Sequence, residues 1–118
     1  MVEIPYLKRR TQHRIGKAGR ASERRLTREL GGRPRPASGA LEGAKADMEL
    51  GQVLLEAKST TRSSVGVKFD WLVKISREAR SEGKTPALSV SFVREDGSPH
   101  LDGEWVMIPM HRFKELLP

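Results

Sequence analysis

The sequence predicts a small α/β domain, because two helical patterns alternate with extended segments. The first helix is expected over about residues 18–30 and the second over about 67–81. A length of 118 residues allows one such domain and little else. Four strands are expected, at residues 46–50, 53–59, 87–93 and 105–108.

The first helix is predicted from the spacing of its apolar residues. Leu26 and Leu30 are four residues apart, and Glu23 precedes Leu26 by three, so these side chains share one face. Gly31 and Gly32 supply a stop signal after Leu30. The glycine- and proline-rich residues 31–44 are expected to form a loop.

The next two segments read as a hairpin closed by Gly51 and Gln52, because glycine suits the first position of a two-residue type II′ turn. Apolar side chains then share one face of the hairpin, and polar side chains dominate the opposite face, which we expect to form an open groove. The apolar positions are Ala46, Met48, Leu50, Val53, Leu55 and Ala57.

Apolar residues at a spacing of four predict the second helix, which should end at Gly83. A turn at 96–99 follows the third strand, and Pro109 ends the fourth strand or places it at a sheet edge. Trp71 and Trp105 are expected in the core, and residues 111–117 could form a short closing helix.

The positive charge is concentrated in the first third of the chain. The net charge is +7, yet residues 1–36 carry 11 basic and only 3 acidic side chains, while the remainder is nearly neutral. Such a segment is typical of a polyanion binder, and the alternative is a solubilising tail. We expect residues 1–17 to be a flexible basic arm. The candidate DNA-binding cations are Lys8, Arg9, Arg10, Arg14, Lys17, Arg20, Arg24, Arg25, Arg28, Arg33 and Arg35.

The hairpin also brings acidic residues together. With Gly51 and Gln52 at the turn, Asp47 faces Glu56 across the two strands, at a Cβ separation of about 4.5–5.5 Å. Lys58 lies two residues further along on the same face. Carboxylates this close repel each other, and Mg²⁺, which prefers oxygen ligands, would offset the repulsion. The backbone carbonyl of Ala57 could add another oxygen.

This cluster suits phosphodiester hydrolysis. A bound Mg²⁺ polarises the phosphate and acidifies a water molecule, while Lys58 orients that water or stabilises developing charge. Glu23, on the apolar face of the first helix, is expected to point inward as a fourth member. The alternative is that Asp47 and Glu56 are solvated residues on an open sheet, Lys58 pairs with Glu56 or Glu49, and Glu23 pairs with an arginine.

Several short segments together resemble the PD-(D/E)XK nucleases, and most closely the archaeal-type Holliday junction resolvases. In chain order they are Ala21-Ser22-Glu23-Arg24, Ala37-Ser38-Gly39, Ala46-Asp47 and Glu56-Ala57-Lys58-Ser59. The resemblance covers roughly residues 16–94. One departure is Ala46, which stands where the family has proline before its first acid.

The resemblance implies a restriction-endonuclease-like core over residues 18–118, with a mixed central sheet flanked by helices. It implies that Asp47 and Glu56 bind Mg²⁺, with Mn²⁺ as a substitute, that Lys58 assists catalysis, and that Glu23 is the family's helical acid. Ser38 matches a loop serine that contacts DNA near the scissile phosphate. The expected activity is paired symmetric nicking of four-way DNA junctions by a homodimer.

Other features narrow the function classes. The chain has no cysteine, which excludes disulfides, thiolate metal sites and a cysteine nucleophile. No apolar run is long enough to span a bilayer, so no membrane association is expected, and we predict a cytoplasmic protein, in the host cytoplasm if it is viral. The competing hypotheses are a nuclease for other DNA structures and a non-catalytic, basic nucleic-acid-binding protein.

Overall fold

A computed structural model describes residues 5–35 and 46–118, with side chains from residue 17 onward. It contains a mixed five-stranded sheet flanked by helices. The predicted α/β class is therefore confirmed, and the architecture is consistent with a restriction-endonuclease-like core. The elements are α1 (Pro5–Leu30), β1 (Arg33–Pro34), β2 (Met48–Leu50), β3 (Val53–Thr60), α2 (Phe69–Ser81), β4 (Thr85–Val93), β5 (Pro99–Met107) and α3 (Met110–Glu115).

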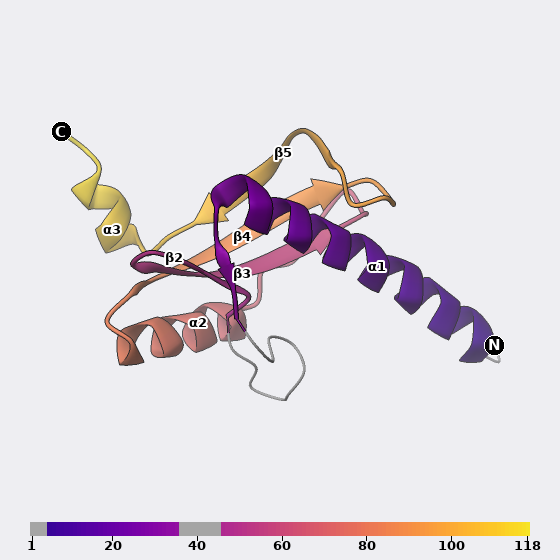
Figure 1. Cartoon of the computed structure of the whole chain (residues 1–118), viewed down its shortest axis with the longest axis horizontal. Helices are drawn as coiled ribbons and strands as arrows, with labels where there is room; N and C mark the ends of the chain where they lie inside the picture. Colours follow the sequence, from indigo (N-terminus) through magenta and orange to yellow (C-terminus); the bar gives the residue numbers. More distant parts are fainter. Residues whose placement is uncertain (1–4, 36–45) are drawn as a thin grey trace.

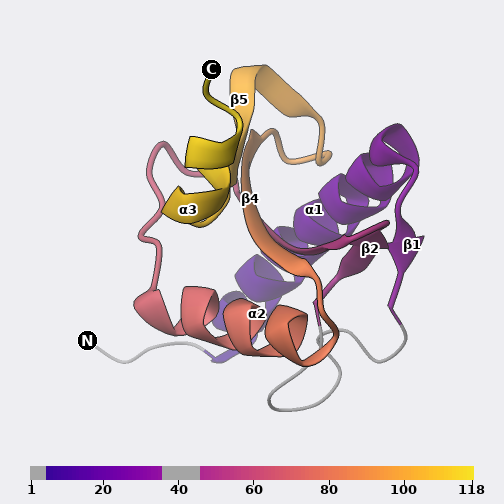
Figure 2. The same ribbon diagram turned by 90° about the vertical axis from the view of Figure 1, so that its left-hand side faces the viewer.

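The strands are ordered β1-β2-β3-β4-β5 across the sheet, so each strand lies beside its neighbours in sequence. The β3–β4 pair is parallel, with α2 as the crossover between the two strands, and every other pair is antiparallel. Helices α1 and α2 cover opposite faces of the sheet (Figure 2). The amino-terminal part of α1 projects beyond the sheet, and α3 lies near the opposite end of the molecule (Figure 1).

Two apolar clusters hold the helices to the sheet. On the α1 face, Leu26 packs with Met48, Leu55 and Ala87. On the α2 face, the cluster consists of Ala46, Leu54, Ile75 and Ala79. The expectation of an open groove on one face of the hairpin is therefore wrong, because Leu54 is fully buried there beneath α2.

The predicted turn and the predicted helix ends are confirmed. Leu50 pairs with Val53 and Met48 with Leu55, and Gly51 has a positive φ of 60°, as the first position of a type II′ turn requires. Gly31 ends α1 at φ 67°, while the N–H of Gly32 bonds to the Thr27 carbonyl, as in a Schellman motif. Gly83 ends α2 in the same way.

Other boundaries differ from the expectation. The first helix begins at Pro5, so the segment expected as a flexible arm is helical from that residue on. At the other end of the sheet, β5 begins at Pro99 rather than Trp105. As an edge strand it buries few side chains, which is why its sequence lacks a clear apolar alternation. Trp105 is 66% exposed, so its expected place in the core is wrong.

The β4–β5 turn packs closely against α1. Gly97 has a φ of 88°, and a Cβ atom there would lie 2.7 Å from the Cβ of Ala21 and 2.9 Å from the carbonyl oxygen of Ala18. No side chain fits between this turn and the helix, so Gly97 helps to fix the position of α1 on the sheet.

We expect Gly97→Ala to lower the free energy of unfolding by about 2–4 kcal/mol, because it combines an unfavourable φ with a steric clash. Gly83→Ala is the matched control, since Gly83 also has a positive φ but a Cβ there would meet no atom within 4 Å. It should cost about 1 kcal/mol. Urea unfolding measures both values, and equal losses would show that the contact with α1 is unimportant.

Candidate active site

The chain bends at Asp47, at the point where it enters β2. The N–H of Asp47 donates to the carbonyl of Leu55 at 3.1 Å, whereas β2 itself pairs Met48 with Leu55. Ala46 packs on the α2 face and Met48 on the α1 face, so the side-chain alternation of a regular strand is broken between them. Asp47 therefore does not project from the sheet face as a regular register would require.

The Asp47 side chain instead turns toward the edge of β3. Its Oδ2 atom accepts a hydrogen bond from the N–H of Ala57 at 2.7 Å, and the residue is only 8% exposed. The N–H and C=O of one residue in an extended strand point to the same side, so the carbonyl of Ala57 also faces Asp47. This is the carbonyl that the sequence analysis expects to add another oxygen.

Glu56 interacts with Asp47, although not through the direct cross-strand pairing that the sequence predicts, because the regular register ends at Met48 and Leu55. Burial raises the pKa of Glu56 to about 7, and the neighbouring negative charge of Asp47 acts in the same direction. A hydrogen bond with Asp47, which requires a proton on Glu56, raises the pKa further, while Lys58 opposes these effects. The two carboxyl groups are therefore in direct contact.

Glu23 approaches the same place from α1. Burial raises the pKa of Glu23, the Asp47 carboxylate raises it as well, and Arg24 only partly opposes them. The alternative in which Glu23 simply pairs with an arginine does not describe this arrangement, because burial and Asp47 dominate. Glu23 on α1 therefore lies near enough to Asp47 to be affected by its charge.

Lys58 supplies positive charge at one side of this cluster. Its Nζ atom lies 3.4 Å from Oε1 of Glu56 and 4.5 Å from the ring centroid of Trp71, the third residue of α2. An indole face attracts an ammonium group, so Trp71 holds Lys58 beside Glu56. The sequence does not predict this contact of Trp71, because no local pattern reveals which strand residue a helix side chain will meet.

A second group of charged residues holds the backbone at Ala46 and Asp47 in place. The N–H of Arg35 donates to the carbonyl of Asp47 at 3.1 Å, and Glu78 Oε2 accepts from the N–H of Ala46 at 2.8 Å. Arg35 also forms ion pairs with Glu78 at 3.0 Å and with Glu49 and Glu82 at 2.8 Å. The residues on both sides of the bend are thereby tied to α2.

The arginines of the basic segment divide into two kinds. Arg25 pairs with Glu104 at 2.8 Å and with Glu29 at 3.0 Å, and the side chain of Arg35 is only 10% exposed. We therefore leave these two out of the candidate DNA surface. Arg33 is exposed beyond the helix. The exposed cations of α1 form one ridge, made of Lys17, Arg20, Arg24 and Arg28.

The other candidate site residues lie outside the described residues or have side chains that are not described. Ser38 is outside the described residues, and so are the side chains of Lys8, Arg9, Arg10 and Arg14, although the backbone at these four positions is helical. None of the helices in residues 5–35 and 46–118 combines the length and the apolar character of a membrane-spanning segment.

The donor set suits a hard divalent cation. Asp47 is buried and the neighbouring Glu56 is partly buried, and a cation would relieve the repulsion between the two carboxylates. Mg²⁺ commonly takes one or two carboxylates together with water and phosphate oxygens. Within the described part of the chain, no three acidic or histidine side chains are already arranged around a common ion position.

Comparison of the chain with family models, curated proteins and solved structures finds no match.

The raised pKa of Glu56 predicts a pH dependence of stability in metal-free protein. A carboxyl group whose pKa is about 7 in the folded protein, above its ordinary value of 4.5, contributes stability that is fully present below pH 4.5 and is lost as the pH rises through 7. We therefore expect the free energy of unfolding to fall between pH 5 and pH 8. Glu56→Gln should remove the part of this decrease that comes from ionisation of Glu56.

Urea unfolding of both proteins in EDTA measures the effect, and the difference between them isolates Glu56 from the three histidines. Parallel stability curves for the two proteins over this pH range would contradict the assigned environment of Glu56.

Proposed function

We propose that this protein is a Mg²⁺-dependent endonuclease that resolves four-way DNA junctions by paired symmetric nicks. The observation that carries the proposal is the group formed by Asp47, Glu56 and Lys58 beside the bend, with Glu23 of α1 near enough to Asp47 to be affected by its charge. An acidic cluster with one lysine, beside a helix that exposes a row of cations, suits hydrolysis of a polyanion.

Asp47 and Glu56 would hold the cation, and the Ala57 carbonyl faces the same position. When bound, a divalent ion would supply positive charge to the scissile phosphate and acidify the attacking water. Mn²⁺ would substitute, because it accepts the same oxygen ligands. Glu23 faces Asp47 and would add negative charge or orient water at that side.

Lys58 would act on the substrate directly. Its ammonium group lies between a carboxylate and an indole, so its position is fixed before DNA arrives. A lysine prepared in this way can orient the attacking water or stabilise the charge that develops on the phosphoryl oxygens.

The substrate class follows from the exposed cations. The ridge formed by Lys17, Arg20, Arg24 and Arg28 presents guanidinium and ammonium groups along one side of α1, at a spacing of three to four residues. These groups suit phosphates rather than base edges, which favours recognition of backbone shape.

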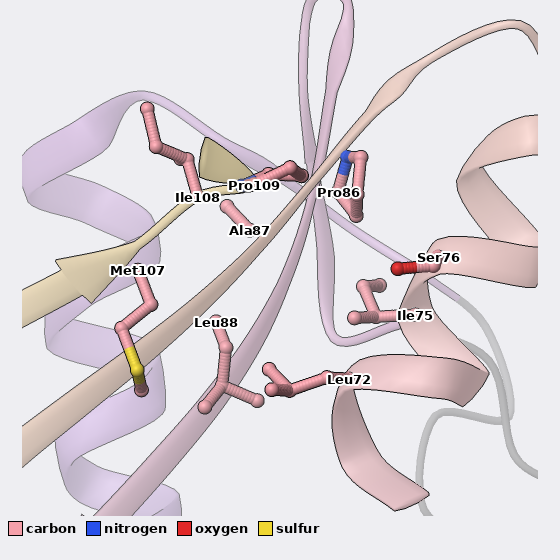
Figure 3. A pocket seen from close by; sticks show the side chains of 9 residues that line it. All are labelled: Leu72, Ile75, Ser76, Pro86, Ala87, Leu88, Met107, Ile108 and Pro109. Carbon is pink, nitrogen blue, oxygen red and sulfur yellow. The ribbon is translucent and has the colours of Figure 1, made fainter. Parts of the chain in front are cut away.

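A homodimer would present two such sites to the two strands that must be cut. An unpartnered apolar face supports this part of the proposal. Helix α3 buries none of its residues, and Met110 and Phe113 are exposed. Beside it lies a hollow of about 280 Å³ between α2, β4 and the end of β5 (Figure 3). Its apolar lining includes Leu72, Ile75, Leu88, Met107 and Ile108.

Cleavage of a four-way junction in Mg²⁺ tests the proposal. We expect the wild-type protein to make two nicks on opposing strands. Glu56→Gln and Lys58→Met should each slow cleavage by at least about 100-fold while the protein still binds the junction, because they remove reactive groups rather than the basic ridge. Glu95→Gln, at an exposed turn, is the matched control and should cleave normally.

Binding without Mg²⁺-dependent cleavage by the wild type would favour the non-catalytic binding protein. Cleavage of linear or nicked duplex at the same rate as the junction would favour a nuclease for other DNA structures.

The basic ridge predicts how salt affects binding. Arg24→Ala and Arg28→Ala should each weaken junction binding uniformly across sequences and reduce the slope of log Kd against log salt concentration by about 1, because each guanidinium releases a counterion on contact with phosphate. Fluorescence anisotropy over a series of salt concentrations measures the slope. Arg112→Ala, on α3, is the control, and an unchanged slope in the two ridge variants would place the DNA elsewhere.

A further inference from the structure

An indole group lies exposed on the edge strand of the sheet, outside the acidic cluster. Trp105 on β5 is 66% exposed, which is unusual because tryptophan side chains are highly buried on average. Its Nε1–H donates to the carbonyl of Asp102 at 2.9 Å. The polar edge of the ring is therefore satisfied within the strand, and the ring is held in one orientation while much of its surface remains open.

The strand register places this indole close to Lys58. Lys58 pairs with Val90, and Val90 pairs with Trp105, so the three residues form one row across β3, β4 and β5. Paired residues of neighbouring strands point to the same face of a sheet. Two strand spacings separate Lys58 from Trp105, which corresponds to about 10 Å between their backbones.

A shallow hollow of about 460 Å³ adjoins the indole. Phe92 and Trp105 supply its aromatic surface, and Arg62 and His100 supply donors for an anion. Arg62 lies just beyond β3, the strand that carries Glu56 and Lys58, so the hollow opens at the same end of the sheet as the candidate active site. Asp102 adds an acceptor that suits the exocyclic amino group of a base.

We propose that this hollow, with Trp105 as its stacking surface, binds a single unpaired base of the DNA next to the site of cleavage. The inference rests on the proposed nuclease function and narrows its substrate class. In an intact duplex both faces of a base are covered by its neighbours, so only an unstacked base can offer a face to an indole. Stacking on an aromatic ring is tolerant of sequence, and Arg62 and His100 would hold the adjoining phosphate.

Such a subsite selects branched DNA by a feature that the basic ridge cannot detect. The ridge contacts phosphates, which are present in every duplex, whereas an extrahelical base occurs where strands exchange, fray or bulge. The enzyme would therefore prefer junctions or flaps with an unpaired nucleotide at the branch.

The test compares two four-way junctions that differ by one unpaired thymidine at the branch, with binding measured by anisotropy in EDTA. We expect wild-type protein to bind the junction with the unpaired thymidine between about 5-fold and 150-fold more tightly. Trp105→Ala should abolish the preference, and Trp105→Phe should retain most of it. Val106→Ala is the matched control, because Val106 is similarly exposed on the same strand but does not line the hollow.

A second measurement does not depend on the stability of the alanine variant. Oligothymidylate of about 12 nucleotides should quench the tryptophan emission of the wild-type protein, and Trp105→Phe should remove that quenching while Trp71 remains. Equal affinity of the wild type for the two junctions, or unchanged emission, would overturn the inference. The inference would also be overturned if Trp105→Ala lost the preference for the unpaired base and changed its mass in sedimentation. The indole would then belong to an interface between protein chains.

The two proposals can fail separately. Metal-dependent cleavage of the fully paired junction without a preference for the unpaired base would leave the nuclease standing and remove this subsite. A Trp105-dependent preference for the unpaired base without cleavage of any DNA would support the base-binding hollow and would contradict the nuclease function.

Discussion

The hydrogen bond from the Ala57 N–H to the Asp47 carboxylate connects the fold to its acidic cluster. It forms because the chain bends just before β2, so that Asp47 lies along the edge of β3 and not on a sheet face. Glu56, the neighbour of Ala57, is thereby brought against Asp47, and its pKa rises first because burial disfavours the charged carboxylate and then because of the negative charge of Asp47. The free energy for this unfavourable contact comes from the rest of the fold, chiefly from the apolar clusters on both sides of the hairpin.

The arginines show how the same residue type serves two purposes in this chain. Arg35 is almost fully covered among Glu49, Glu78 and Glu82, and loss of this arginine would leave their negative charges close together without its compensation. Its backbone N–H meanwhile holds the Asp47 carbonyl, so this ion-pair group stabilises the bend that forms the candidate site. The arginines of the α1 ridge have open surroundings and remain available to a polyanion. Net charge alone cannot separate these two kinds, because it counts both equally.

Local sequence patterns predict the parts of this fold that depend on neighbouring residues. The Gly51 turn and the glycine stops after α1 and α2 follow from spacing along the chain. The hairpin also brings Asp47 near Glu56, but the bend that turns Asp47 toward the edge of β3 is not predicted. The patterns fail where tertiary contacts decide. In the sequence, Leu54 is an apolar residue on an otherwise polar face, and only the packing of α2 explains why it is buried. Strand β5 has too few buried side chains to show an apolar alternation. The contact of Trp71 with Lys58 depends on how α2 packs on the sheet, which no local pattern encodes.

Helix α1 links the basic surface to the acidic cluster within a single turn. Glu23 faces inward toward Asp47, and the adjacent Arg24 faces solvent in the exposed ridge. Under the proposed function, DNA bound along this ridge would have its phosphates close to the acidic residues on the other side of the same helix. That arrangement requires a helix that cannot slide or rotate on the sheet. The close contact of Gly97 with Ala18 and Ala21, just before Glu23, contributes to this constraint, because the turn packs against the helix with no room for a side chain between them.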